Sequence, residues 1–250
     1  MPRTIGVLGG LGPWATLYFF EQILRLTPAE RDQDHLRVVI DNNPAIPDRT
    51  PAILAGGEDP VPALVATARN LQRAGAEVIA IPCNTAHAFY PAVAAAVEVP
   101  VLHIMEEVAR AIRQRYPETR RVGLLATRGT VATGLYPRAL APACEVLVPP
   151  AEEQETVDRL IYAIKAQRAD RRLRQEAVAV ARRLVERGAA LLILGCTELP
   201  LALAQTDLPV PMLDSTRVLA AAAVREALQG EDPVPGRAAS PAAGRSMTTT

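Results

Sequence analysis

Short apolar runs alternate along the chain with longer stretches in which apolar residues recur at helical spacing. Runs of this kind, bounded by turn residues, are typical of strands buried on both faces of a parallel sheet. The runs are Ile5–Leu8, Val38–Ile40, Val78–Ile81, Val101–Ile104, Val122–Leu125, Glu145–Val148, Leu191–Leu194 and Met212–Leu213. Their alternation with helical stretches predicts an α/β fold with mostly parallel sheets flanked by helices.

Two of the intervening stretches predict helices with well-marked ends. One has Asp59 as its N-cap, Pro60 in the first helical position and Gly75 at its C-terminal stop. The other runs from about Glu176 to Arg187 and stops at Gly188. In both, apolar residues fall on one face, which we expect to cover a sheet.

The chain also contains an internal repeat. Leu71–Thr85 (LQRAGAEVIAIPCNT) aligns without a gap with Leu184–Glu198 (LVERGAALLILGCTE). Flanking strands match in the same order, IGVLGG with VGLLAT and VPVLHI with VPMLDS. Three matches in register predict two copies of one α/β unit. We expect one domain at 1–103 together with about 212–230, and a second at 104–211.

Composition narrows the classes of partner and compartment. Lys plus Arg and Asp plus Glu number 27 each, so the chain lacks the basic excess of a nucleic-acid or anionic-membrane binder. Three widely spaced cysteines suit a reducing compartment, and we expect a cytoplasmic protein. The apolar stretch after Arg3 is broken by Gly and Pro, so neither a secretory leader nor a membrane span is expected. The tail from Glu231 to Thr250 has the composition of a disordered segment.

Cys83 and Cys196 stand at equivalent positions of the two copies, each directly after a strand. In open α/β sheets, ligands bind beyond the carboxyl ends of the strands, where loops lead into helix N-termini. A helix N-terminus lowers the pKa of a thiol, so we expect both cysteines to be reactive. Two opposed thiols can remove a proton from a carbon and return one to its opposite face, which predicts a racemase or epimerase. Cys144 has no counterpart in the repeat and is expected to be structural.

The segments GVLGGLGPWAT, NNPAIPDRT, PCNTAHAF, GLLATRGT and LGCTELP closely resemble the cofactor-independent aspartate racemases of the aspartate/glutamate racemase family. The resemblance runs from about Ile5 to Leu228. It implies two similar α/β domains with the active site between them, often a homodimer, and catalysis without pyridoxal phosphate or metal. It also implies that Cys83 and Cys196 are the two bases, one a thiolate and the other a thiol. The expected substrate is a small acidic amino acid, most simply aspartate, with glutamate or a broader range of amino acids as the alternative.

The resemblance further implies which residues surround the substrate, and we add two contacts to them. They are Asn84, Thr85, Thr127 and Thr197 at the amino acid head group, Arg49 and Lys165 at the side-chain carboxylate, and Gly10 and Glu198 as the added contacts. Arg49 lies in a turn-rich loop, and its guanidinium offers a carboxylate a two-pronged fork. Glu198 could instead orient a thiol. Leu11 departs from the family pattern, where many relatives have Met.

A dinucleotide-binding oxidoreductase is the main alternative from another class. The segment GLGPWA from Gly10 fits G-x-G-x-x-A after a strand, and Asp41 ends the next strand. Pro13, however, removes a backbone donor from the loop that would hold the pyrophosphate. This alternative also leaves the two matched cysteines unexplained.

Two cofactor sites, one for zinc and one for pyridoxal phosphate, are further alternatives. Cys83, His87 and Cys196 could supply three ligands to zinc, and Lys165 could form a Schiff base with pyridoxal phosphate. We expect neither group, because the paired thiols account for the chemistry without them.

Overall fold

The computed structural model describes residues 1–229, so the tail that we predicted to be disordered lies outside the described residues. Within them, two sheets form the centre of the fold, and all of their strand pairs are parallel. The first sheet has the order β2 (Val38–Asn42), β1 (Ile5–Gly9), β3 (Val78–Ala80). The second has the order β5 (Glu145–Leu147), β4 (Arg121–Leu125), β6 (Leu191–Leu194), β7 (Met212–Asp214).

The two sheets repeat one topology, as the internal repeat predicts. β1, β2 and β3 correspond to β4, β5 and β6 in both chain order and sheet order. The fourth strand of the first sheet, predicted at Val101–Ile104, is reduced to a single bridge between Ile79 and Val101. The prediction of a full strand was wrong because the chain turns at once into a helix that begins at Ile104.

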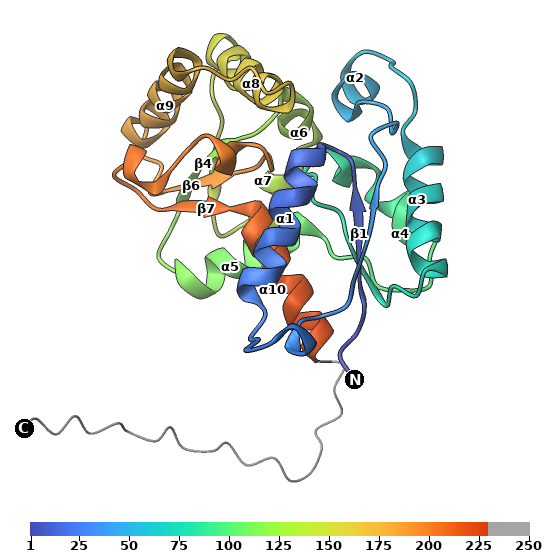
Figure 1. Ribbon diagram of the computed structural model, residues 1–250. Coiled ribbons are helices and arrows are strands. Elements are labelled where there is room, and N and C mark those ends of the chain that lie inside the picture. The colour runs from blue at the N-terminus through green and yellow to red at the C-terminus, as the bar shows by residue number, and fades with distance from the viewer. Residues whose placement is uncertain (230–250) are drawn as a thin grey trace, which may run out of the picture.

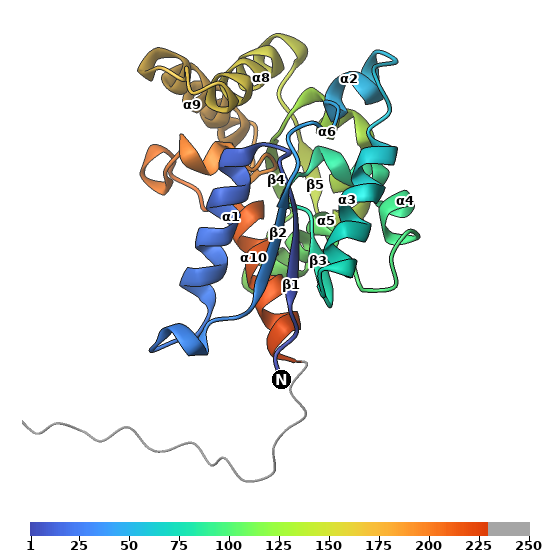
Figure 2. The ribbon, with the colours of Figure 1, turned by 45° about the vertical axis from the view of Figure 1, so that its right-hand side comes forward.

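Helices cover both sheets (Figures 1 and 2). They are α1 (Pro13–Leu26), α2 (Arg49–Leu54), α3 (Val61–Arg73), α4 (Tyr90–Ala94), α5 (Ile104–Arg115), α6 (Arg128–Thr133), α7 (Leu135–Leu140), α8 (Ala151–Lys165), α9 (Arg171–Glu186) and α10 (Ser215–Leu228). Short 3₁₀ turns are η1 (Asp32–Asp34), η2 (Thr85–Phe89), η3 (Leu199–Leu201) and η4 (Gln205–Asp207).

The ends of α3 and α9 test the capping signals. The side chain of Asp59 accepts the backbone N–H of Val61 at 2.9 Å, and Gly75 has the positive φ of a helix stop. α9 stops before Gly188 in the same way but begins earlier than we predicted. Its N-cap is Asp170, whose carboxylate accepts the N–H of Leu173 at 2.7 Å.

The C-terminal elements do not all belong to the first half. We predicted that about 212–230 returns there, but β7 pairs with β6 at the edge of the second sheet. α10 then packs against α1 and α5. One apolar core, with buried residues from β1, β4, β6, α5 and α10, is therefore shared by both halves.

The carboxyl end of β1 points toward the top of the molecule in Figure 1. α2, α6 and α8 gather at that end in both views (Figures 1 and 2), and α6 contacts both α2 and α8. Residues that follow β1, β3, β4 and β6 are thereby brought together beneath these three helices. Among residues 1–229, no helix is long and apolar enough to cross a membrane.

Candidate active site

Cys83 and Cys196 lie at the carboxyl ends of β3 and β6, and each keeps only 6% of its surface exposed. The backbone N–H of Cys83 donates to the carbonyl of Ile81 at 2.7 Å, which turns the chain sharply after the strand. The segments that follow the two cysteines are the 3₁₀ turns η2 and η3 instead of the α-helices that we predicted. Such short turns supply little of the helix dipole invoked from the sequence.

Cys196 is paired with Glu198. Its thiol donates to Oε2 of Glu198 at 3.0 Å, and the hydroxyl of Thr197 donates to the same oxygen at 3.3 Å. Burial raises the pKa of Cys196 well above its ordinary value, and the charge of the Glu198 carboxylate raises it further. The expectation of a lowered pKa was therefore wrong for this cysteine, which is a protonated thiol at neutral pH.

Lys165, at the end of α8, is the cation of the site. Burial lowers the pKa of Lys165. The carboxylate of Glu198 and two sulfurs raise it, and together they outweigh the effect of burial. Those sulfurs belong to Cys196 and Cys83, and the guanidinium of Arg49 acts in the opposite direction. The net effect raises the pKa of Lys165, so the ammonium is retained at neutral pH.

Arg49 is almost fully buried and is held by backbone carbonyls. It is the first residue of α2, so it is not in the loop where the sequence placed it. Nη1 donates to the carbonyls of Ile46 at 3.2 Å and Pro47 at 2.9 Å, and Nη2 donates to that of Leu11 at 3.0 Å. Within residues 1–229, Nε has no hydrogen-bond partner. Of the five N–H groups of a guanidinium, one on Nε and one on Nη2 are left for a ligand.

Asn84 connects the two halves through its side chain. The hydroxyl of Tyr136 donates to Oδ1 at 2.6 Å, and Nδ2 donates to the hydroxyl of Ser215 at 3.0 Å. Ser215 in turn donates to the carbonyl of Leu194 at 2.7 Å. Tyr136 and Ser215 were not identified from the sequence, because they lie far from Asn84 along the chain. The expected contact of Asn84 with a substrate stays a prediction.

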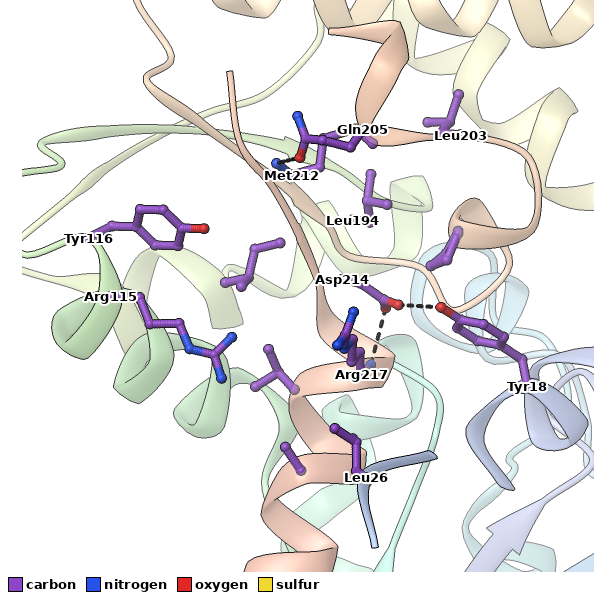
Figure 3. Close-up of a pocket in the computed structure, with 14 residues that line it drawn as sticks. Tyr18, Leu26, Arg115, Tyr116, Leu194, Leu203, Gln205, Met212, Asp214 and Arg217 are labelled. Atoms are coloured by element: carbon purple, nitrogen blue, oxygen red, sulfur yellow. Dashed lines mark hydrogen bonds between the residues drawn. The ribbon is translucent and has the colours of Figure 1, made fainter. Parts of the chain in front are cut away.

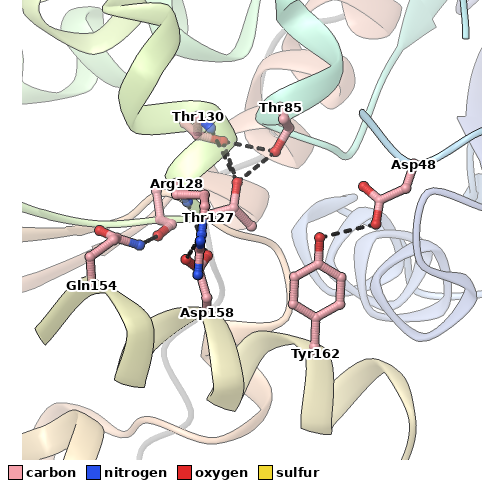
Figure 4. Close-up of polar contacts among 9 residues, drawn as sticks. Asp48, Thr85, Thr127, Arg128, Thr130, Gln154, Asp158 and Tyr162 are labelled. Carbon is pink, nitrogen blue, oxygen red and sulfur yellow. Dashed lines mark hydrogen bonds and ion pairs between the residues drawn. The ribbon is translucent and has the colours of Figure 1, made fainter. Parts of the chain in front are cut away.

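Three threonine hydroxyls, one of them two residues after Cys83, form a buried cluster (Figure 4). The hydroxyl of Thr85 lies 3.0 Å from that of Thr127 and 2.8 Å from that of Thr130, and the latter two are 3.1 Å apart. Thr127 also caps α6 by accepting the N–H of Thr130 at 3.2 Å. Two of these residues were expected from the sequence, whereas Thr130 was missed because its position inside α6 carries no sequence signal.

A hydrogen bond between Tyr162 of α8 and Asp48, the N-cap of α2, joins the two halves at a place that we call the rim of the site (Figure 4). The hydroxyl of Tyr162 donates to Oδ2 of Asp48 at 3.0 Å, across the gap between α8 and the start of α2. Within the second half, Asp158 of α8 forms an ion pair of 2.7 Å with Arg128 of α6. Lys165, at the end of the same helix, has its Nζ 5.0 Å from the centre of the Tyr162 ring.

The two glycines of the GLGPWA segment are packed against protein. Gly10 has a φ of +85° and leaves no room for a Cβ against the backbone of Asn43. Gly12 is packed in the same way against Oε1 of Glu198, which has no hydrogen-bond partner within residues 1–229. A carboxylate at this place would repel a pyrophosphate, which argues against the dinucleotide alternative. The expected contact of Gly10 with a substrate stays a prediction.

The zinc alternative fails on the orientation of His87. Its Nδ1 lies 2.9 Å from the carbonyl oxygen of Cys83, and its Nε2 accepts the N–H of Ile104 at 3.1 Å. Both ring nitrogens are thus taken by backbone groups. In the described part of the chain, no group of three His, Cys, Asp or Glu residues is placed to hold a metal ion.

A cavity of about 470 Å³ lies elsewhere, between α1, α5, α10 and β7 (Figure 3). Tyr18, Arg115 and Arg217 line it, and Tyr18 donates to Asp214 at 2.8 Å on its floor. Neither Cys83 nor Cys196 lines this cavity. Both thiols are almost fully buried.

Known proteins are similar to this chain in both sequence and fold. The Asp/Glu/Hydantoin racemase family matches residues 8–223. A broad specificity amino-acid racemase, RacX of Bacillus subtilis, is 30% identical over 229 residues, which cover 88% of this chain and 96% of the relative. A glutamate racemase of Thermus thermophilus is 36% identical over 172 residues, covering 64% of this chain and 59% of the relative.

Among solved structures, the aspartate racemase of Picrophilus torridus is similar with a TM-score of 0.81 and 30% identity. That match covers 90% of this chain and 94% of the other. The family model and these relatives match nearly the whole described chain in sequence and in fold. The protein therefore belongs to the Asp/Glu/hydantoin racemase family and is an amino acid racemase.

Proposed function

We propose that this racemase interconverts L- and D-aspartate by a two-base mechanism, without a cofactor. The observation that carries the proposal is that Cys83 and Cys196 stand at equivalent strand ends of the two halves, and that both sulfurs contribute to the raised pKa of Lys165. Two sulfurs from opposite halves can address the two faces of one Cα. A positive group beside them stabilises the negative charge that develops when the proton leaves.

The two thiols take different roles because their surroundings differ. Cys196 is held as a protonated thiol by burial and by Glu198, so it is the proton donor in the resting enzyme. We assign the role of the first base to Cys83: its sulfur takes the proton as the Cα–H bond breaks and an S–H bond forms. The S–H bond of Cys196 breaks as a new Cα–H bond forms on the opposite face. The reverse reaction runs through the same two steps with the roles exchanged.

Arg49 supports an acidic substrate. Three backbone carbonyls fix its guanidinium, and the two N–H groups left over on Nε and Nη2 lie side by side, where they can hold one carboxylate with two hydrogen bonds. Lys165 adds a point charge. Aspartate is the simplest substrate for this pair. Glutamate or a broader set of amino acids is the alternative, in keeping with the relatives named above.

The mechanism is tested by racemisation in D₂O, followed by chiral chromatography and mass spectrometry. From either enantiomer of aspartate, the inverted product should carry deuterium at Cα while the recovered substrate stays largely unlabelled at early times. Cys83→Ala and Cys196→Ala should each abolish racemisation and keep the circular dichroism spectrum of the wild type. Near-normal turnover in either variant, or equal early labelling of substrate and product, contradicts two-base catalysis.

The substrate class is tested at Arg49. Arg49→Leu should lower kcat/KM for aspartate by about 10- to 100-fold, the range expected for losing a charge-assisted pair of hydrogen bonds. Turnover of alanine, which has no side-chain carboxylate, should change much less. The measurement compares both substrates for wild type and variant. Equal losses for aspartate and alanine would remove the proposed role of Arg49.

A further inference from the structure

His87 lies behind the catalytic turn and does not enter the mechanism above. Its side chain is 1% exposed, and its ring joins two segments of backbone. Nδ1 lies 2.9 Å from the carbonyl oxygen of Cys83, and Nε2 lies 3.1 Å from the backbone nitrogen of Ile104, the first residue of α5. The imidazole therefore ties the residue that carries one thiol to the start of a core helix.

These two contacts fix the protonation state of the ring. The N–H of Ile104 can only donate, so Nε2 must carry a lone pair, and the proton of the neutral ring is then on Nδ1. That proton is donated to the carbonyl of Cys83. In the other tautomer, the proton on Nε2 would be donated to the carbonyl oxygen of Leu102, which lies 3.4 Å from Nε2. That proton would also point at the N–H of Ile104, so two donors would oppose each other. Burial, together with the charge of His103, lowers the pKa of His87 to about 4, so the ring is neutral at neutral pH.

The two thiols are held by different means. Cys196 has Glu198 as a side-chain partner for its sulfur. At Cys83 the contacts are made to the backbone, by the carbonyl of Ile81 on one side and by the ring of His87 on the other. Any group that fixes the main chain of Cys83 also fixes the position of its sulfur relative to a bound substrate.

We propose that His87 is a positioning residue for Cys83, and that the donation from Nδ1 to the Cys83 carbonyl sets the distance between that sulfur and the substrate Cα. This inference rests on the proposed two-base function. His87 touches neither substrate nor sulfur, so its effect is exerted through the backbone alone. A misplacement of a reacting group by about 1 Å lowers the rate roughly 100-fold. Loss of the single hydrogen bond from His87 to the backbone of Cys83 can therefore have a large effect on kcat.

Two substitutions separate the two contacts of the ring. In His87→Asn, Nδ2 replaces Nδ1 and keeps the donation to Cys83, while the acceptor for Ile104 is lost. In His87→Gln, Oε1 replaces Nε2 and keeps the acceptor for Ile104, while the donation to Cys83 is lost. We expect His87→Gln to lower kcat by about 100-fold with little change in KM, and His87→Asn to stay within about 10-fold of the wild type.

A third variant controls for the packing of the ring. Tyr90 stacks on His87 with ring centres 6.0 Å apart, and its hydroxyl donates to the carbonyl of Val101 at 2.9 Å. Tyr90→Phe removes a hydrogen bond from the same cluster without touching the Cys83 turn. Its kcat should stay near that of the wild type. A role of His87 in stability alone would instead make kcat follow the melting temperature across all three variants.

Two further measurements decide the inference. With α-deuterated aspartate, His87→Gln should raise the kinetic isotope effect for only the enantiomer whose Cα–H faces Cys83. Alkylation by iodoacetamide, read by mass spectrometry without turnover, should change at Cys83 and stay constant at Cys196. Equal losses in His87→Asn and His87→Gln, or an isotope effect raised equally for both enantiomers, would overturn the role of His87. An inactive wild type would instead overturn the proposed racemase function.

Discussion

The protonation of Cys196 depends on one carboxylate, that of Glu198. Burial and the Glu198 charge both raise the pKa of the thiol, and only the charge can be removed by substitution. Glu198→Gln should therefore lower the pKa of Cys196. A fall of one unit raises the thiolate fraction about 10-fold at a pH below the pKa, and the rate of alkylation by iodoacetamide should rise accordingly. The alkaline limb of the pH profile of kcat, which marks loss of the donor proton, should move to lower pH.

Cys144 serves as the internal standard for that experiment. It is partly exposed, and its thiol donates to the carbonyl of Thr119 at 3.2 Å, away from Glu198. Its alkylation rate should be the same in wild type and variant. A uniform increase at all cysteines would indicate general loosening of the fold, and an unchanged rate at Cys196 would remove the proposed control by Glu198.

The sequence predicts the residues that carry chemistry better than those that hold them. The internal repeat singles out Cys83 and Cys196 because a thiol recurs at the same strand end in both copies. Tyr136 and Ser215, which form one hydrogen bond with each end of the Asn84 amide, follow no local pattern. Contacts between residues so distant along the chain depend on how the two halves pack, and a single sequence does not encode that packing as a readable pattern.

At the scale of elements, apolar runs predict strands reliably where a second strand is present on each side. β1, β4 and β6 are fully or almost fully buried, and each lies where its apolar run was found. The run at Val101–Ile104 is equally apolar, but its last residue begins α5, so only one bridge forms. Periodicity also misses the start of α9, because the residues after Asp170 are mostly polar and lie on the exposed face.

The segments after the two cysteines show where an argument from element type fails. The N-terminus of an α-helix lowers a thiol pKa because several aligned N–H groups are unpaired there. η2 and η3 are 3₁₀ turns, and within η3 the first N–H groups are already paired with nearby carbonyls. Burial then dominates at Cys196, and its pKa rises. Burial and the Glu198 charge therefore decide the sign of the shift.

At the scale of the whole molecule, the two halves share one apolar core. α5 and α10 follow equivalent strands, pack against each other, and contribute to the core that both sheets share. The match of VPVLHI with VPMLDS already implied that Met212–Asp214 is the fourth strand of the second sheet. The predicted domain boundary at 212 places this strand in the first domain, whereas β7 pairs with β6 of the second sheet. The expected homodimer stays a prediction, since nothing in a single chain tests it.

A rigid core leaves the rim as the part that must open for a substrate to enter. Both thiols are almost fully buried, and the bond from Tyr162 to Asp48 joins α8 to the start of α2 in the first half. This bond is exposed to solvent, so its contribution to the free energy of closure is at the low end of about 0.5–1.5 kcal/mol. The remaining contacts of α8 are with its own half, chiefly with α9. Removal of one hydrogen bond should therefore shift the rim measurably toward the open form without unfolding the core.

Tyr162→Phe should accordingly speed the alkylation of both active-site thiols by iodoacetamide about 2- to 5-fold, because the rate follows the open fraction when opening is fast. Tyr18→Phe is the matched control: it removes another tyrosine–aspartate bond, from Tyr18 to Asp214 at 2.8 Å, which lies away from the rim. That variant should leave the alkylation rates unchanged even if its melting temperature falls further, since Tyr18 is the more buried of the two tyrosines. Faster alkylation in both variants would mean that the thiols become accessible through general unfolding. No change in either would mean that substrate enters by a route that does not involve α8.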